Sequence, residues 1–314
     1  MPQDTATAVD MTAFRMPEGV VNGAGEPLDW DVIDWSAEEK AVRRLRLRIF
    51  KAAQAGNWKQ VRNLQQLMLR SRANTLVSVR QVSQRNTGRR TPGVDGEVAL
   101  TSASRARLAT LLHHQGGTAL PVRRVYIPKR GGKLNKRPLG IPVIADRARQ
   151  NLVRNALEPE WEARLDRRQY GFRPGRSCHD AIEAIFTTAR GRSTRGWVLD
   201  ADLEAAFDRL DHDHMTRKLK GFPALDQIQE WLKAGVVDKG RYAPTEYGAP
   251  QGGAISPLLL NVALQGIEEA AGTRYITRGE TKPGTPVVVV YADDLVALCH
   301  SAEQAEQVRQ RLTE

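Results

Sequence analysis

Two groups of acidic residues occur where acidic residues are uncommon. Asp293 and Asp294 follow the apolar run Val287–Tyr291, and strand interiors disfavour aspartate. Two adjacent carboxylates at the tip of a buried hairpin repel each other unless a cation is bound beside them. The pattern therefore predicts a cation site at this turn. A solvated turn with two polar residues is the alternative.

The second acidic group ends a predicted strand over residues 197–203. Asp200 and Asp202 project to the same face of that strand, because successive side chains alternate. If this strand lies beside the first one, Asp202 and Asp293 can share a pair of Mg²⁺ ions, with the backbone carbonyl of Leu203 as a further ligand. Such a pair activates a 3′-hydroxyl and stabilises a leaving pyrophosphate. We take Asp202 as the ligand and Asp200 as its support.

The elements that must position these acids are helices alternating with few strands, which predicts an α+β fold. Periodicity and turn residues predict strands over 122–128, 137–142, 197–203, 287–291 and 295–299. Helices are expected from a capping box at Ser36 and Glu39, from Asn57, from a cap at Asp146, over 178–190, 204–210 and 258–270, and from Ser301. Gly131 and Gly132 read as a hairpin turn.

Charge divides the chain into blocks. Residues 1–34 hold seven acids and one base and predict a flexible tail, whereas residues 35–176 hold 31 Lys and Arg against nine Asp and Glu. Residues 177–314 are acidic, so the order predicts a polyanion-binding surface beside a cation site. Basic residues that merely solvate helices are the alternative. For the first helical hairpin, both packing and RNA contact through outer arginines such as Arg43 and Arg44 are open.

Several classes of protein are excluded by composition. Two cysteines, Cys178 and Cys299, make neither a disulfide framework nor a cysteine-rich zinc module. The apolar run from Val287 is too short to cross a bilayer, and no basic segment with an apolar stretch opens the chain. We therefore expect a cytoplasmic, reduced protein with no membrane partner.

Four motifs, in this order along the chain, resemble those of the bacterial group II intron-encoded reverse transcriptase and maturase family. The motifs are Arg137–Pro142, Tyr170–Ser177, Pro250–Asn261 and Tyr291–Asp294, with Asp202 and Phe207 between the second and third. The basic helices before Thr91 resemble the N-terminal extension of the same branch. The resemblance covers about residues 35–314.

The resemblance implies a role for particular residues. Asp202, Asp293 and Asp294 match the catalytic carboxylates, with Asp294 the weaker metal ligand. Phe207 matches the aromatic residue that excludes a ribose 2′-hydroxyl by filling volume. The remaining nucleotide-binding residues are expected to be Lys129, Arg137, Ala205, Ala206, Gln251 and Tyr291. The RNA-binding residues are expected to be Arg43, Arg44, Arg173 and Arg176.

The resemblance also implies a right-hand polymerase with an antiparallel palm sheet packed on helices. We expect an acidic tail over 1–34, a basic helical extension over 35–110, fingers over 111–195 and an incomplete palm over 196–314. The chain ends twenty residues after Asp294, before any thumb, which a partner chain could supply.

The expected function is RNA-directed DNA synthesis with two Mg²⁺ ions, adding dNTPs to a DNA primer on an RNA template, together with binding of intron RNA. The alternatives are a maturase-like splicing factor that does not polymerise, and a retron or defence reverse transcriptase.

Overall fold

The computed structural model describes residues 28–114, 117–128, 136–190, 195–277 and 279–313, and the backbone of the short strand β1 (Thr7–Ala8). The chain forms two compact units, each built from two stretches of sequence. Unit 1 combines Met1–Ala163 with Phe207–Ser256, and unit 2 combines Arg164–Ala206 with Pro257–Glu314.

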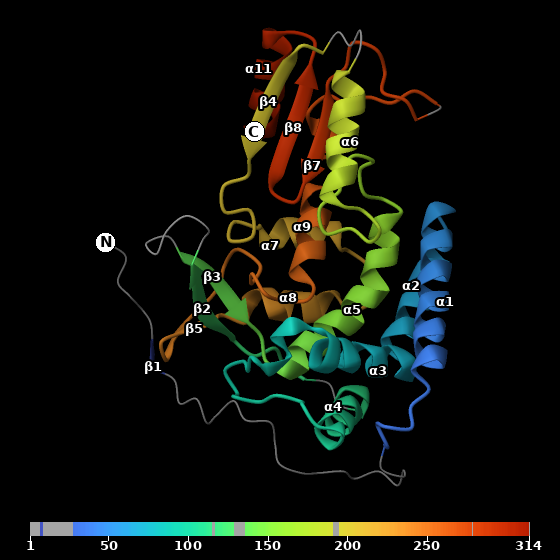
Figure 1. Cartoon of the computed structure of the whole chain (residues 1–314), viewed down its shortest axis with the longest axis vertical. Coiled ribbons are helices and arrows are strands. Elements are labelled where there is room, and N and C mark those ends of the chain that lie inside the picture. The colour runs from blue at the N-terminus through green and yellow to red at the C-terminus, as the bar shows by residue number, and fades with distance from the viewer. Residues whose placement is uncertain are drawn as a thin grey trace. The chain divides into compact units, whose positions relative to one another are not determined.

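Unit 1 is mainly helical. Its helices are α1 (Trp35–Gln54), α2 (Trp58–Leu69), α3 (Arg72–Arg80), α4 (Ser102–His114), α5 (Ile144–Glu162), α7 (His212–Lys218) and α8 (Leu225–Lys233). A π-helical turn (Gln81–Arg85) and a 3-10 turn (Thr87–Arg90) follow α3. The hairpin of α1 and α2 packs against α5 (Figure 1), which is buried along most of its length. The basic N-terminal helices therefore build part of the hydrophobic core.

A five-stranded sheet completes unit 1. Its strands are β2 (Val122–Pro128), β3 (Lys136–Ile141), β5 (Val236–Asp238), β6 (Arg241–Ala243) and β1, in the order β1-β6-β5-β2-β3. Strands β2 and β3 pair antiparallel, as the sequence predicts, and β5 joins β2 in parallel. The predicted turn at Gly131 and Gly132 lies outside the described residues.

Unit 2 is a three-stranded antiparallel sheet with helices on both faces. The strands are β4 (Trp197–Asp202), β7 (Val287–Tyr291) and β8 (Asp294–Cys299), in the order β4-β8-β7. The helices are α6 (Cys178–Ala189), α9 (Ser256–Leu264), α10 (Ile267–Ala270) and α11 (Ala302–Thr313). In Figure 1, β7 and β8 form a hairpin, with β4 next to β8 and α6 along β7.

The unbroken valine run of β7 follows from burial on both of its faces. Val287 and Val289 pack with Ala181 of α6 on one face. Val288 and Val290 pack on the other face with residues of α10 and α11. Strand β7, which leads into the turn at Ala292 and Asp293 (the acidic turn), is therefore packed on both faces.

The first helix begins earlier than predicted. Its N-cap is Asp34, whose Oδ1 accepts a hydrogen bond from the Ala37 amide at 3.1 Å, so the predicted cap at Ser36 is wrong. Glu39 instead pairs with Arg80 and Arg85 of the next helices. Trp30 is buried, so residues 28–34 belong to the folded unit although the sequence places them in the tail. Elsewhere in that predicted tail, the structure describes only the backbone of β1, which pairs antiparallel with β6.

Helix α5 also begins before its predicted cap. Its N-cap is Val143, and Asp146 lies within the first turn, almost fully buried. The Asp146 carboxylate accepts hydrogen bonds from the Leu120 amide at 3.0 Å and from the Trp231 indole at 3.3 Å. A buried acid must find donors, and Asp146 finds them on neighbouring segments.

Of two further predicted helices, one does not form and the other is interrupted. Residues 204–209 form turns, because Ala205 has a φ of 54°, which a right-handed helix does not accommodate. The predicted helix over 258–270 is divided into α9 and α10 at Gly266, whose φ is 97°. The predicted division of the chain into tail, extension, fingers and palm stays a prediction.

Candidate active site

The two acidic groups meet through the register of the unit 2 sheet. Asp202, the last residue of β4, lies directly opposite Asp294, the first residue of β8. Asp200 lies opposite Val296 in the same ladder. Opposed residues of an antiparallel pair share one face, so these three acids project from the same side of the sheet. All three are exposed, which leaves them open to a ligand.

The turn that carries Asp293 is short and strained. Ala292 and Asp293 are its two central residues, because Tyr291 pairs with Asp294. Ala292 has a φ of 60°, a conformation that hairpin turns usually assign to glycine. The amide of Leu203 donates a hydrogen bond to the Asp293 carbonyl oxygen at 3.0 Å, so the turn is fastened to the end of β4.

A neighbouring segment supports this turn from within unit 2. The Tyr170 amide donates to the Val290 carbonyl and the Val290 amide donates to the Arg168 carbonyl, both at 2.8 Å. Gly171 then passes so close to the turn that an added Cβ would lie 2.2 Å from the nitrogen of Ala292. This glycine belongs to the Tyr170–Ser177 motif, but the sequence indicates no role for it, because a close approach between distant segments is not visible in a local pattern.

The electrostatics of the cluster favour a bound cation. The pKa of the Asp294 carboxyl is raised above its ordinary value, first by partial desolvation and then by repulsion from neighbouring carboxylates. Those neighbours are Asp293, Asp202 and Asp200. The four acids thus feel one another's charge, and a divalent ion would relieve that repulsion.

The oxygen donors of this cluster fit a metal ion whose remaining coordination positions are filled by the substrate. Within the described part of the chain, no three His, Cys, Asp or Glu side chains are close enough together to form a closed metal site. Mg²⁺ is commonly held by one or two carboxylates plus substrate phosphates, so a partial protein cage is the arrangement it needs. The chemistry of Asp202 and Asp293 fits this ion; the Leu203 carbonyl stays a predicted ligand.

Unit 1 brings together several residues that the sequence assigned to nucleotide binding. The Phe207 carbonyl accepts a hydrogen bond from the Ala249 amide at 2.7 Å, and the Gln251 carbonyl accepts one from the Gly140 amide at 2.9 Å. Gly252 fits against β3, since a Cβ there would lie 2.6 Å from the Gly140 carbonyl oxygen. Phe207 and strand β3 are therefore each joined by a backbone hydrogen bond to the segment Ala249–Gln251.

The other described residues that are predicted to bind a nucleotide lie on β3, in the turn after β4 and at the end of β7. Arg137 is exposed on β3, and Ala205 lies in the turn that follows β4 with its left-handed backbone. Ala206 follows it in the same turn, and Tyr291 is partly exposed at the end of β7. Lys129 lies outside the described residues. The nucleotide-binding roles of these residues stay predictions.

The arginines of the first helix divide into two groups. Arg46 forms an ion pair with Glu158 and donates to the Asn155 side chain at 3.1 Å, and both partners lie on α5. Arg43 and Arg44 are exposed. Packing therefore accounts for Arg46, and RNA contact through Arg43 and Arg44 stays a prediction.

The two arginines of the loop before α6 hold that loop together. Arg173 is buried and donates to the carbonyls of Asp166 and Gln169, each at 2.8 Å. Arg176 donates to the Arg167 carbonyl at 2.7 Å. These contacts give both side chains a structural task, so RNA binding through them is less favoured than through exposed arginines.

Comparison with protein families identifies the chain. Residues 127–314 match the family described as reverse transcriptase (RNA-dependent DNA polymerase). The chain belongs to the reverse transcriptase family. Residues 30–112 match the N-terminal domain of reverse transcriptase, so the family relationship extends over the basic helices of unit 1.

The relatives of this reverse transcriptase include proteins encoded by group II introns. Protein YkfC of Escherichia coli is 36% identical over 67% of this chain and 58% of its own length. Group II intron-encoded protein LtrA of Lactococcus lactis is 38% identical over 48% of this chain and 25% of its own length. The chain therefore spans between a quarter and three fifths of these two relatives.

One solved structure that the chain resembles is described as a partial Cas6-RT-Cas1--Cas2 complex. The match covers 74% of this reverse transcriptase and 38% of the chain in that complex, with 19% sequence identity and a TM-score of 0.44. At that score the likeness says nothing about function. In the described ranges, no helix combines the length and the apolar character that crossing a membrane requires.

Proposed function

We propose that this reverse transcriptase adds deoxynucleotides to the 3′-end of a DNA primer on an RNA template, as part of a group II intron-type protein. The proposal includes two Mg²⁺ ions at Asp202 and Asp293 and a cytoplasmic location. The observation that supports it most directly is the register that opposes Asp202 to Asp294 beside the Ala292–Asp293 turn.

The reaction forms a bond between the primer 3′-oxygen and the α-phosphorus of the dNTP. The bond from that phosphorus to the pyrophosphate oxygen breaks, and the 3′-hydroxyl proton passes to solvent water. Two bound divalent ions would activate the hydroxyl and neutralise charge on the leaving group. Asp202 and Asp293 hold these ions in the proposal, while Asp294 adds negative charge beside them.

Substrate choice is assigned to unit 1. A ring at Phe207 rejects a ribose 2′-hydroxyl by volume alone, and the glycines after Gln251 allow the backbone to approach a nucleotide closely. The exposed guanidinium of Arg137 is suited to triphosphate oxygens. RNA template, DNA primer and dNTPs are the partners that these groups would recognise.

The test is primer extension on an RNA template with Mg²⁺, comparing wild type with Asp293→Asn. We expect extension to fall by at least about 100-fold in the variant, because a neutral amide is a poor Mg²⁺ ligand. Asp226→Asn is the matched control, since Asp226 is an exposed acid on α8. Equal extension by wild type and Asp293→Asn would contradict the proposed role of the carboxylates in binding the catalytic ions.

A second candidate function is intron RNA binding that aids splicing. It is supported by the excess of 31 basic over nine acidic residues across 35–176 and by the exposed Arg43 and Arg44. A Euglena gracilis relative described as maturase-like protein 1 is 26% identical over 74% of this chain and 51% of its own length. Tight, salt-dependent RNA binding that is unchanged in Asp293→Asn, without any extension, would favour this function over synthesis.

A further inference from the structure

The acidic turn rests on a buried polar network that neither catalysis nor nucleotide binding explains. Asn261 on α9 and Gln169 before α6 are both fully buried. The Asn261 amide group donates a hydrogen bond to the Gly171 carbonyl oxygen at 2.8 Å. The Gln169 amide group donates to the backbone and side-chain oxygens of Asn261 at 3.0 and 3.1 Å. A buried amide N–H group is costly unless it is hydrogen-bonded, so these donors fix their partners in place.

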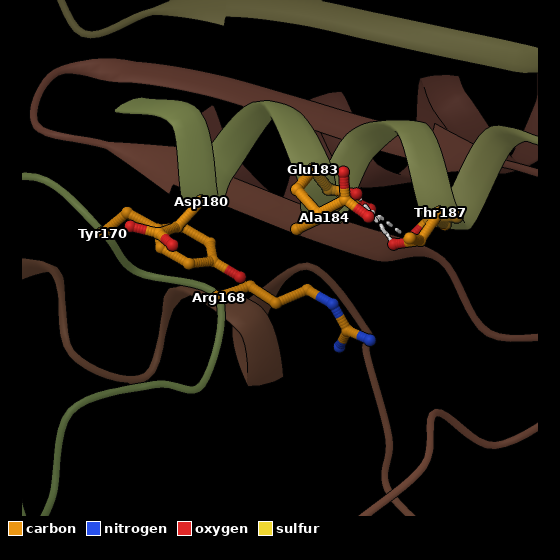
Figure 2. Close-up of a pocket in the computed structure, with 7 residues that line it drawn as sticks. Arg168, Tyr170, Asp180, Glu183, Ala184 and Thr187 are labelled. Carbon is orange, nitrogen blue, oxygen red and sulfur yellow. Dashed lines mark hydrogen bonds between the residues drawn. The ribbon is translucent and has the colours of Figure 1, made fainter. Parts of the chain in front are cut away.

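The segment from Arg168 to Gly171 behaves as a short extra strand beside β7. Gln169 forms an isolated parallel bridge with Val290. Side chains alternate along such a segment, and Figure 2 shows Arg168 and Tyr170 in an open pocket of about 390 Å³ beneath α6. The Gln169 side chain and the Gly171 carbonyl oxygen instead form hydrogen bonds with Asn261. The pocket side chains are therefore separate from the contacts that reach the turn.

The network reaches the acidic turn through a backbone contact between Gly171 and Ala292. The position of a Cβ on Gly171 would be 2.2 Å from the Ala292 nitrogen and 2.8 Å from its Cα. The Gly171 peptide is thus pressed directly against the left-handed residue of the turn. A shift of that peptide would therefore displace Ala292 and, with it, Asp293, which is the next residue in the chain.

We infer that Asn261 is a positioning residue for the metal-binding turn. It holds the Gly171 carbonyl, the Gly171 backbone supports Ala292, and Ala292 sets the place of the Asp293 carboxylate. This inference rests on the proposed function, because it assumes that Asp293 binds a divalent ion. It assigns Asn261, the last residue of the Pro250–Asn261 motif, to metal placement and not to nucleotide contact.

The test compares Asn261→Ala and Asn261→Asp with wild type. Asn261→Asp keeps the shape of the side chain but has no amide group to donate to Gly171. Mn²⁺ serves as the probe of the site, with free Mn²⁺ measured by electron paramagnetic resonance. We expect both variants to bind Mn²⁺ about 10-fold more weakly and to lower kcat of extension about 10- to 100-fold, which is the usual effect of losing a group that orients a metal ligand. The KM for dNTP should stay within about twofold, since the Asn261 side chain is fully buried and is therefore not exposed to a bound nucleotide.

Asn74→Ala is the matched control for lost stability. Asn74 is a fully buried asparagine of unit 1 that donates its amide group to the carbonyls of Met68 and Leu152, each at 3.0 Å. It should lower the melting temperature as Asn261→Ala does, while kcat and Mn²⁺ affinity stay those of wild type. Unchanged Mn²⁺ affinity and kcat in both Asn261 variants would overturn the inference.

Failure of the proposed function gives a different result. If wild type binds Mn²⁺ in a manner that Asp293→Asn abolishes, yet extends no primer, then DNA synthesis by this chain is refuted. The role of Asn261 is still decided by its effect on Mn²⁺ affinity. If wild type shows no Mn²⁺ binding that depends on Asp293, the inference is overturned together with the metal site.

Discussion

The amide of Leu203 donates a hydrogen bond to the carbonyl oxygen of Asp293 at 3.0 Å, one residue beyond the end of the β4–β8 ladder. This contact joins the backbone of one acidic group to the turn that carries the other. It makes the separation of Asp202 and Asp293 a property of the backbone, so side-chain packing alone does not determine it.

Replacing Leu203 with proline tests this backbone link. Proline has no N–H to donate, so Leu203→Pro should release the turn and lower primer extension by about 100-fold or more. Leu203→Ala keeps both backbone groups and should retain at least about 10-fold more activity than the proline variant. Extension rates per folded molecule, with folding checked by circular dichroism, measure the difference. Equal losses in the two variants would show that the leucine side chain matters and the hydrogen bond does not.

A methyl group at Gly171 should disturb the acidic turn. The added Cβ has backbone atoms as its nearest neighbours, which cannot rotate away. We expect Gly171→Ala to lower the melting temperature by several degrees and kcat by about 10-fold or more. Gly196→Ala is the control, because a Cβ at Gly196 has nothing within 4 Å. Wild-type kinetics in Gly171→Ala would mean that the turn moves freely to make room.

Shortening Phe207 should admit ribonucleotides. Its ring is assigned the role of a steric barrier, so Phe207→Ala should raise the incorporation of rNTP relative to dNTP by about 10- to 100-fold. The measurement is the ratio of kcat/KM for the two sugars on the same RNA template. Phe186→Ala removes an exposed ring of α6 and should leave the ratio unchanged. A ratio that does not respond to Phe207→Ala would place the sugar discrimination elsewhere.

Substitutions of the α1 arginines should affect either the melting temperature or the RNA affinity, depending on the residue. Arg46→Ala removes the partner of buried Glu158 and should lower the melting temperature, with little change in RNA affinity. The double variant Arg43→Ala with Arg44→Ala should leave melting unchanged and weaken RNA binding. It should also reduce the slope of log affinity against log salt by about 1–2, because up to two phosphate contacts are lost. An unchanged salt slope would exclude these two arginines from the RNA surface.

Asp95 should make unit 1 less stable as the pH rises. Burial raises the pKa of the Asp95 carboxyl to about 6 from 3.8. The folded state therefore holds this proton more tightly than the unfolded state, so stability is lost as the pH rises from about 4 to 6 and stays low above it. Asp95→Asn should melt at a higher temperature than wild type at pH 7, by a few degrees.

That gain should vanish near pH 4, where the carboxyl is neutral in the folded state. Thermal melts of wild type and Asp95→Asn across this pH range give the comparison. A difference in melting temperature that is constant with pH would show that Asp95 does not titrate in this interval. The Asn86→Ala variant, in which an exposed cap of the 3-10 turn is lost, should lower melting equally at every pH.

The sequence predicted the strands of the candidate site well, because their apolar runs are bounded by residues that strands disfavour. Val287–Tyr291 has the predicted limits, and β4 and β8 each differ from their predicted limits by one residue. The sequence failed where a distant partner decides the local structure. Asp146 resembles a helix cap, yet its hydrogen-bond donors are Leu120 and Trp231, which no local pattern reveals.

The candidate site shows the same division between local and distant signals. The acidic residues could be found because carboxylates at strand ends are unusual in themselves. The support by Gly171 and Asn261 could not, since an asparagine on an apolar helix and a glycine in a loop have many ordinary explanations. Their importance depends on a contact between segments more than a hundred residues apart in the chain.

The left-handed backbone at Ala292 has an evolutionary consequence. A glycine at this position would relieve the strain and stabilise the hairpin, but it would also widen the range of conformations open to the neighbouring acid. Selection for heat resistance and selection for rapid turnover would then favour different residues at one site that bears no functional group.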